Sequence, residues 1–349
     1  MRVPMSGHER PIGDAIDWTF AAGVGARLAR PGPSMSSYTA DAVVTELAAA
    51  ADRAEEPVRQ LTGLGAGHEA PSPARVVDRT GWVRAAAGSM ADLTGGGQDN
   101  ASWTGKPAGI QAGAMLAYLS SAVLGQYDPF SRTLLLVAPN VVAVERALKV
   151  PTADFRLWVC LHEVTHRVQF AEAPWMAESM RAATAELGAA ADESVTEVAG
   201  RIIAVVRDRR GTDEKSMSER GVLGLLRATQ SETQQLALDR MLALGTLLEG
   251  HADHVMDAVG PGVVPAVARI RRSFDNRRRR SSNPLHRMIR ALLGMDAKMA
   301  QYVHGKKFVD TVVNRVGMAE FNAVWSGPDQ MPTLAEIDDP DAWIARVLG

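Results

Sequence analysis

Apolar residues recur at three- and four-residue spacing along most of the chain, which is typical of amphipathic helices. The segments with this spacing are bounded by glycine, proline or small polar residues, as helix ends commonly are. They are residues 16–28, 37–54, 82–93, 110–120, 139–148, 155–170, 175–207 and 231–258. Ser231, with Gln234 three residues later, matches a capping box. We therefore expect a mainly α-helical fold, in which Pro57 begins a further short helix.

Two breaks in the helical pattern predict a small β-sheet. Residues 75–78 form a short strand candidate. Residues 122–126 and 133–137 flank the turn sequence Tyr127-Asp128-Pro129, a pattern typical of a hairpin. We expect this hairpin to lie beside the helix at residues 155–170.

Neither an internal repeat nor a composition break divides the 349 residues. The sequence predicts a single domain, residues 1–349, because this length suits one large domain. Within it we distinguish an N-terminal helical part (about 14–62), a core (about 74–260) and a C-terminal helical part (about 264–349). In the later chain we expect a polar loop at 208–218, helices at 219–228, 264–270, 284–304 and 306–316, and a last short helix with Trp343.

Composition narrows the class of protein. The hydrophobic share is 46%, enough for a substantial core, and the net charge is −2, which argues against a nucleic-acid or membrane-surface binder. The N-terminus lacks the apolar stretch of a signal peptide, and the apolar run 133–144 is too short to cross a bilayer. We expect a cytoplasmic protein with no nucleic-acid or membrane partner. The basic run Arg271–Arg280 is interpreted as a solvated loop.

The chemistry is concentrated in a His-Glu-x-x-His motif. His162 and His166 are four residues apart, so on a helix they share one face and can direct two imidazoles at one metal ion. Glu163 lies one step round the helix, within reach of a water bound to that metal. Two histidines and a neighbouring carboxylate in this spacing predict a zinc site in which Glu163 is the general base.

A zinc site of this kind needs a third protein ligand, and a later helix offers two sets of candidates. Glu249 and Asp253 share one face, and His251 and His254 share another, so both pairs cannot face the same ion. Zincins of the thermolysin type carry Glu-x-x-x-Asp, where the Glu binds zinc and the Asp orients a ligand histidine. We favour Glu249 as the ligand and Asp253 as the orienting carboxylate. The histidines are the alternative.

Several other residues carry weaker signals. Tyr127, Tyr302 and His304 are candidates for stabilising a developing oxyanion, and nothing in the sequence selects among them. Cys160 precedes His162 by two residues and should point into the core. Arg167 and Gln169 are interpreted as structural or rim groups.

Residues 162–170 and 248–257 together resemble a family of zincin-like metallohydrolases of actinobacteria, one branch of which is associated with biosynthesis of a deazaflavin coenzyme. Residues 17–18, 30–33, 125–129, 321–325 and 332–334 are also similar to that branch. The resemblance implies a zincin-like, mainly helical fold and a zinc-dependent hydrolase. It implies His162, His166 and Glu249 as ligands and Glu163 as the base, but brings no settled substrate.

Together these observations predict a zinc metallopeptidase. The alternatives are a zinc-dependent amidase acting on small molecules near deazaflavin metabolism, and a non-catalytic helical scaffold that retains zinc. A peptidase would bind an extended peptide or small amide beside an edge strand, for which residues 133–137 are the candidate.

Overall fold

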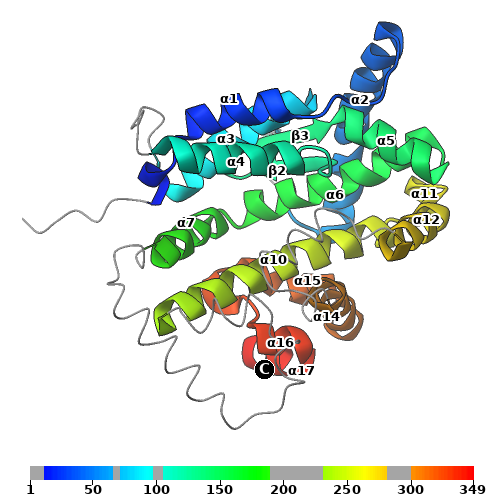
Figure 1. The fold of residues 1–349 in the computed structure, drawn as a ribbon. Coiled ribbons are helices and arrows are strands. Elements are labelled where there is room, and N and C mark those ends of the chain that lie inside the picture. Colours follow the sequence, from blue (N-terminus) through cyan, green and yellow to red (C-terminus); the bar gives the residue numbers. More distant parts are fainter. Residues whose placement is uncertain (1–11, 66–70, 97–104, 189–230, 281–299) are drawn as a thin grey trace, which may run out of the picture.

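The helix that carries the His-Glu-x-x-His motif lies at the centre of the fold. This helix, α6 (Thr152–Glu172), is in contact with α2 (Ser37–Thr62) and with α10 (Glu232–Ala258). Figure 1 shows α6 crossing the middle of the molecule with α10 running beside it. The computed structural model describes residues 12–65, 71–96, 105–188, 231–280 and 300–349. Within them, no helix is long and apolar enough to cross a bilayer.

The other helices fall into three groups along the chain. Those near the sheet are α1 (Trp18–Leu28), α3 (Arg79–Thr94) and α4 (Lys106–Leu119), with the 3-10 turn η1 (Ile12–Ala15). Around α6 and α10 are α5 (Ala138–Leu148), α7 (Trp175–Gly188), α11 (Gly260–Val263) and α12 (Val267–Arg280). The C-terminal group is α14 (Ala300–Val316), α15 (Met318–Phe321), η5 (Asn322–Trp325), η6 (Pro328–Gln330), α16 (Leu334–Asp338) and α17 (Pro340–Val347).

A three-stranded sheet in the order β1-β3-β2 lies against this helical frame. Strand β1 (Arg75–Val77) is parallel to β3 (Thr133–Val137), and β2 (Gly125–Asp128) is antiparallel to it. In register, Gly125 pairs with Leu136 and Asp128 with Thr133. Strand β2 is an outer strand and contacts α6.

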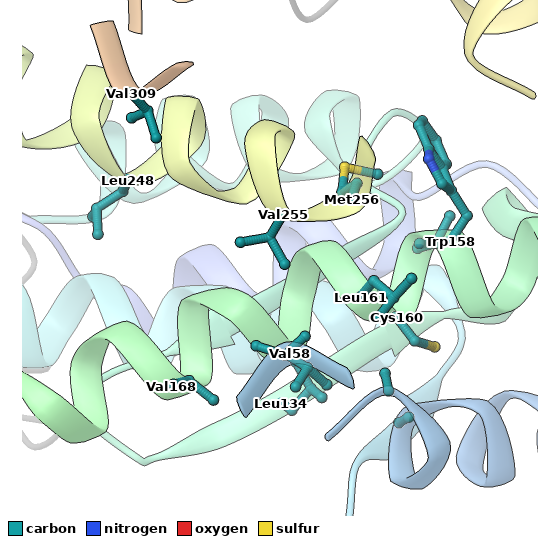
Figure 2. Packing of buried hydrophobic residues seen from close by; sticks show 14 of the residues in the cluster. Val58, Leu134, Trp158, Cys160, Leu161, Val168, Leu248, Val255, Met256 and Val309 are labelled. Carbon is teal, nitrogen blue, oxygen red and sulfur yellow. The ribbon is translucent and has the colours of Figure 1, made fainter. Parts of the chain in front are cut away.

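The main core surrounds α6, which contributes a run of apolar side chains to it. Phe155, Cys160, Leu161 and Val164 are fully buried. Figure 2 shows Val58, Leu134, Val168, Val255 and other core residues from α2, β3, α6 and α10 around it. Almost half of the residues of α6 are polar, and several of these are buried together with the apolar ones. Neighbouring elements therefore cover most of α6, and its buried polar groups need partners or open space.

The predicted mainly α-helical fold with a small sheet is confirmed. The capping box of Ser231 and Gln234 is present, and Cys160 is buried in the core as predicted. The predictions for residues 189–228 and 284–299, which include the polar loop 208–218, lie outside the described residues.

Three predictions about the elements are wrong. Helix α2 continues through Pro57, because Ala54 and Val58 on either side are fully buried. Burial of this face outweighs the one backbone hydrogen bond that proline removes.

The hairpin is the second correction, because its first strand was predicted at residues 122–126 and its turn at 127–129. The strand instead begins at Gly125, and the turn follows Asp128. The Asp128 carboxylate accepts hydrogen bonds from the Phe130 amide (3.1 Å) and the Ser131 hydroxyl (2.5 Å).

The basic run is the third correction. It forms most of helix α12 instead of a solvated loop. The Arg271 guanidinium lies 2.8 Å from Asp257, 3.6 Å from Asp253 and 5.2 Å from the Trp158 ring centre. These contacts to α10 and α6 hold the first part of the run in regular structure.

The contact between α10 and α14 predicts opposite effects for two glycines on one helix. A Cβ atom on Gly250 would lie 2.3 Å from the Gly305 carbonyl carbon, whereas a Cβ on Gly245 would meet nothing within 4 Å. Gly250→Ala should lower the free energy of unfolding by about 1–3 kcal/mol through overpacking. Gly245→Ala should raise it by up to about 1 kcal/mol through helix propensity. Urea denaturation of both variants measures the difference, and two shifts of the same sign would contradict this packing.

Candidate metal centre

Three side chains from two helices converge on one point. The Nε2 atoms of His162 and His166 are 3.1 Å apart. Glu249, from α10, places one carboxylate oxygen 3.4 Å from His162 Nε2 and the other 3.6 Å from His166 Nε2. The two histidines share a face of α6 because they are one turn apart, and α10 packs against that helix. Among the described residues, this is the group of His, Cys, Asp and Glu whose donor atoms are close enough to hold a metal ion.

The spacing of the three donors fits zinc. Nitrogen and oxygen ligands bind zinc at about 2.0–2.1 Å, which puts neighbouring donors of a tetrahedral site about 3.3–3.4 Å apart. The observed separations of 3.1, 3.4 and 3.6 Å bracket that value. Two imidazoles and one carboxylate are also a common zinc ligand set, with a fourth position left for water or substrate.

Hydrogen bonding at the far side of His162 supports its role as a ligand. Its Nδ1 lies 3.2 Å from the Met256 sulfur. A thioether only accepts hydrogen bonds, so the proton of the neutral ring belongs on Nδ1. In the neutral ring the lone pair of Nε2 then faces the other two donors, as metal binding requires, whereas a second proton on Nε2 would be donated to Glu249.

The charges of the centre favour a cation. Burial lowers the pKa of His162, but the hydrogen bond and charge of Glu249, with the charges of Glu163 and Asp253, outweigh burial and raise this pKa to about 9. Burial acts to raise the pKa of Glu249, yet its hydrogen bonds to His162 and His166 hold it well below its usual range. Glu249 is therefore an anionic candidate ligand across the physiological pH range.

Glu163 lies beside the cluster, but its pKa and its hydrogen bonding differ from those of Glu249. Its pKa is raised because burial and the charge of Glu249 outweigh the two histidines. None of the described residues donates a hydrogen bond to its carboxylate. Strand β2 approaches it so closely that a Cβ atom on Gly125 would lie 2.6 Å from Glu163 Cγ and 2.7 Å from Cδ. Glycine at position 125 therefore gives this carboxylate its space.

The cluster opens into a cavity of about 860 Å³. His162, Glu163, His166 and Glu249 all line it, as does strand β2 through Gly125, Gln126 and Tyr127. Most of the remaining wall is apolar and comes from distant parts of the chain, including Leu28, Met90, Leu93, Leu124, Phe130, Val144, Trp158, Phe170, Met180, Leu248, Met256 and Phe274.

The structure brings some predicted residues into other roles. Asp253 lines the cavity, but its nearest charged partner is Arg271 of α12, and the Nδ1 atoms of His162 and His166 face Met256 and Gln169. The expected orientation of a ligand histidine by Asp253 is therefore not the arrangement observed. Sequence spacing could not show that an arginine from another helix takes up this carboxylate.

The competing histidines of α10 turn away from the centre. His251 is fully buried against Phe321 and Trp325, and burial followed by the charges of His254 and His166 lowers its pKa to about 3. His254 pairs with Asp310 at 2.7 Å. His251 thus remains neutral inside the core, and His254 serves the packing of α10 on α14.

Among the candidates for stabilising an oxyanion, Tyr127 lines the cavity, and burial raises the pKa of its hydroxyl. His304 pairs with Asp338 at 2.6 Å, and the side chain of Tyr302 is not among those described. Two further residues, Gly125 and Gln169, adjoin the centre without having been predicted as functional. For Gly125, the sequence did offer a signal, namely a glycine at the start of strand β2.

Comparisons with known proteins found a family model and a solved structure that match the chain. A family model for zincin-like metallopeptidases matches residues 16–344. The chain is also similar to a crystal structure of a proposed hydrolase with a novel fold from Chloroflexus aurantiacus. The two share 28% sequence identity, the TM-score is 0.66, and the match covers 95% of this chain and 98% of the other. No curated protein matches the chain.

The raised pKa of His162 predicts that metal affinity depends on pH. Below pH 9 its ring carries a second proton, which must leave before the ring can bind a metal. The apparent zinc affinity should therefore rise roughly tenfold per pH unit between about pH 6.5 and 8.5 and level off near pH 9. Competition with a zinc-binding dye, with circular dichroism at each pH as the folding control, measures this. A constant affinity over the range would contradict the prediction.

Proposed function

The chain belongs to the zincin-like metallopeptidase family, and on that premise we propose that it is a zinc-dependent hydrolase that cleaves peptides. The observation that carries the proposal is the convergence of His162, His166 and Glu249 in one cavity with a carboxylate, Glu163, that none of the described residues engages by a hydrogen bond. Zinc, when bound there, would polarise a carbonyl and make water more acidic.

In this proposal, each residue of the centre has a separate role. His162, His166 and Glu249 hold the metal. Glu163 takes a proton from the attacking water and returns it to the leaving amine nitrogen. Its raised pKa suits both halves of that task, because a pKa nearer the operating pH lets one group accept a proton and then give it up. Tyr127 remains protonated and can donate a hydrogen bond to a substrate oxygen in the same cavity.

Strand β2 supports a peptide substrate. The prediction that residues 133–137 provide the edge strand is wrong, because β3 is flanked by β1 on one side and β2 on the other. Strand β2 is the outer strand nearest Glu163, and Gly125, Gln126 and Tyr127 line the cavity. An extended peptide can lie along such a strand by main-chain hydrogen bonding.

A small-molecule amidase is the second candidate. It is favoured by the cavity volume of about 860 Å³, which falls within the range of small-molecule sites, and by the mostly apolar wall. The link to a deazaflavin coenzyme rests on the resemblance of the sequence alone. A mixed peptide library and a panel of small N-acyl amides, assayed in parallel, distinguish the two activities.

Replacing the proposed base and one ligand should separate chemistry from metal binding. The parent protein, purified without chelators, should contain about one zinc per chain. Glu163→Gln is nearly isosteric and should keep the zinc while hydrolysis falls about 100- to 10,000-fold. His162→Ala should lose the zinc as well as the activity.

Metal analysis and turnover assays on the same preparations provide both measurements. Zinc-free parent protein would contradict the hydrolase proposal. A zinc-bound parent that cleaves neither substrate class, and whose binding to protein partners survives Glu163→Gln, would favour a scaffold.

Gly125→Ala tests whether the space beside Glu163 matters. The new methyl group would lie within 3 Å of three atoms of the Glu163 side chain, so this side chain must move. Turnover should fall roughly 100-fold, as expected for a catalytic group displaced by about 1 Å, while zinc content stays unchanged. Gly88→Ala is the matched control, since a Cβ there meets nothing within 4 Å. Equal turnover in the two variants would show that the position of Glu163 does not depend on Gly125.

A further inference from the structure

Gln169 lies fully buried between α6 and α10, three residues after the second motif histidine. Its side chain makes three polar contacts. Oε1 lies 2.9 Å from His166 Nδ1, and Nε2 lies 3.1 Å from the Leu248 carbonyl oxygen and 2.9 Å from His251 Nδ1. One amide thus contacts a proposed ligand, the backbone next to another proposed ligand, and a core histidine.

The backbone carbonyl decides which way this amide points. A carbonyl oxygen only accepts hydrogen bonds, so the group beside Leu248 must be the amide nitrogen of Gln169. The second N–H of that nitrogen is directed at His251 Nδ1, which accepts it. The reverse orientation would place two oxygen atoms in contact inside the core, at the cost of an unpaired buried group.

The amide orientation then determines the proton position on His166. With the nitrogen of Gln169 facing α10, its oxygen faces His166 Nδ1. An amide oxygen only accepts, so Nδ1 carries the proton and Nε2 presents a lone pair. That Nε2 lies 3.1 Å from His162 Nε2 and 3.6 Å from a Glu249 oxygen.

The same side chain also connects the two helices of the centre. Leu248 immediately precedes Glu249 on α10, and His166 is on α6. The hydrogen bonds of Gln169 therefore join the ring of one ligand to the backbone that carries another. Loss of the amide would release the His166 ring and leave the Leu248 carbonyl without this contact.

We propose that Gln169 is a positioning residue of the metal centre, which sets the tautomer of His166 and holds the Glu249 segment of α10 against α6. This inference rests on the proposed zinc site. It adds a residue that touches neither metal nor substrate and acts through two ligands. Outer groups that orient ligand histidines typically contribute 10- to 100-fold in metal affinity.

Gln169→Met removes the amide while nearly preserving the shape of the side chain. Thr165→Val is the matched control, because Thr165 is also fully buried on α6 but its hydroxyl bonds only within the helix, to the Leu161 carbonyl at 2.7 Å. The zinc dissociation constant should rise about 10- to 100-fold in Gln169→Met and stay within about twofold of the parent in Thr165→Val. The visible spectrum of the cobalt-substituted protein should change only in Gln169→Met.

A second measurement needs no variant. Nitrogen-15 NMR of the zinc-loaded parent should show the His166 ring protonated at Nδ1. Parent affinity and an unchanged cobalt spectrum in Gln169→Met, or a His166 ring protonated at Nε2, would overturn the proposal. A parent that binds no zinc would instead refute the proposed function, so the two failures are distinguishable.

Discussion

Burial of α6 is the constraint on which the rest of the structure depends. A polar group buried without a partner costs about 1–3 kcal/mol, and a charged one costs more. Arg156 is accordingly paired with Glu145 and Glu46, and Arg167 with Glu55. The motif residues His162, Glu163 and His166 are placed differently. They face the cavity, where the two histidines meet Glu249 of α10. Arg156, Arg167 and Gln169 have counterparts on neighbouring elements, whereas none of the described residues donates a hydrogen bond to Glu163.

Three consecutive residues of α10 contact α6 on one side and α14 on the other. The Leu248 carbonyl accepts the Gln169 amide, Glu249 reaches the two histidines, and Gly250 lies against the backbone of Gly305 on α14. Successive side chains on a helix differ by about 100° in direction, so Glu249 and Gly250 serve different neighbours. Small residues where α10 and α14 cross let the two helices approach closely. The position of Glu249 thus depends on contacts to both sides of its helix.

Local sequence patterns predicted most helices and strands and the candidate metal-binding residues, but not the tertiary contacts between elements. The spacing of His162 and His166 follows from one helix turn, and helix phase showed that Glu249 and His251 compete. The choice of Glu249 came from the Glu-x-x-x-Asp pattern of thermolysin-type zincins. The partner of Asp253 did not follow, because Arg271 comes from another helix and its side chain is placed by tertiary packing. The prediction that β3 is an edge strand was wrong because it too depended on a tertiary contact. Strand β1 is 55 or more residues from β3 in sequence, and its pairing makes β3 the central strand. Pro57 was misjudged because burial of a long helix face overrides one lost hydrogen bond.

The two glutamates of the centre show how environment assigns roles to identical side chains. Glu249 accepts hydrogen bonds from two histidines, and its pKa lies well below the usual range. Glu163 is buried beside a glycine, none of the described residues donates a hydrogen bond to it, and its pKa is raised. Environments that push two carboxyl pKa values apart separate an acid–base group from a permanently charged one. Exchanging the two positions would leave the metal with a protonatable ligand and the water with a weak base. The packing of α10 and β2 around α6, more than the motif itself, therefore determines which glutamate suits the proposed ligand role and which suits the proposed proton transfer.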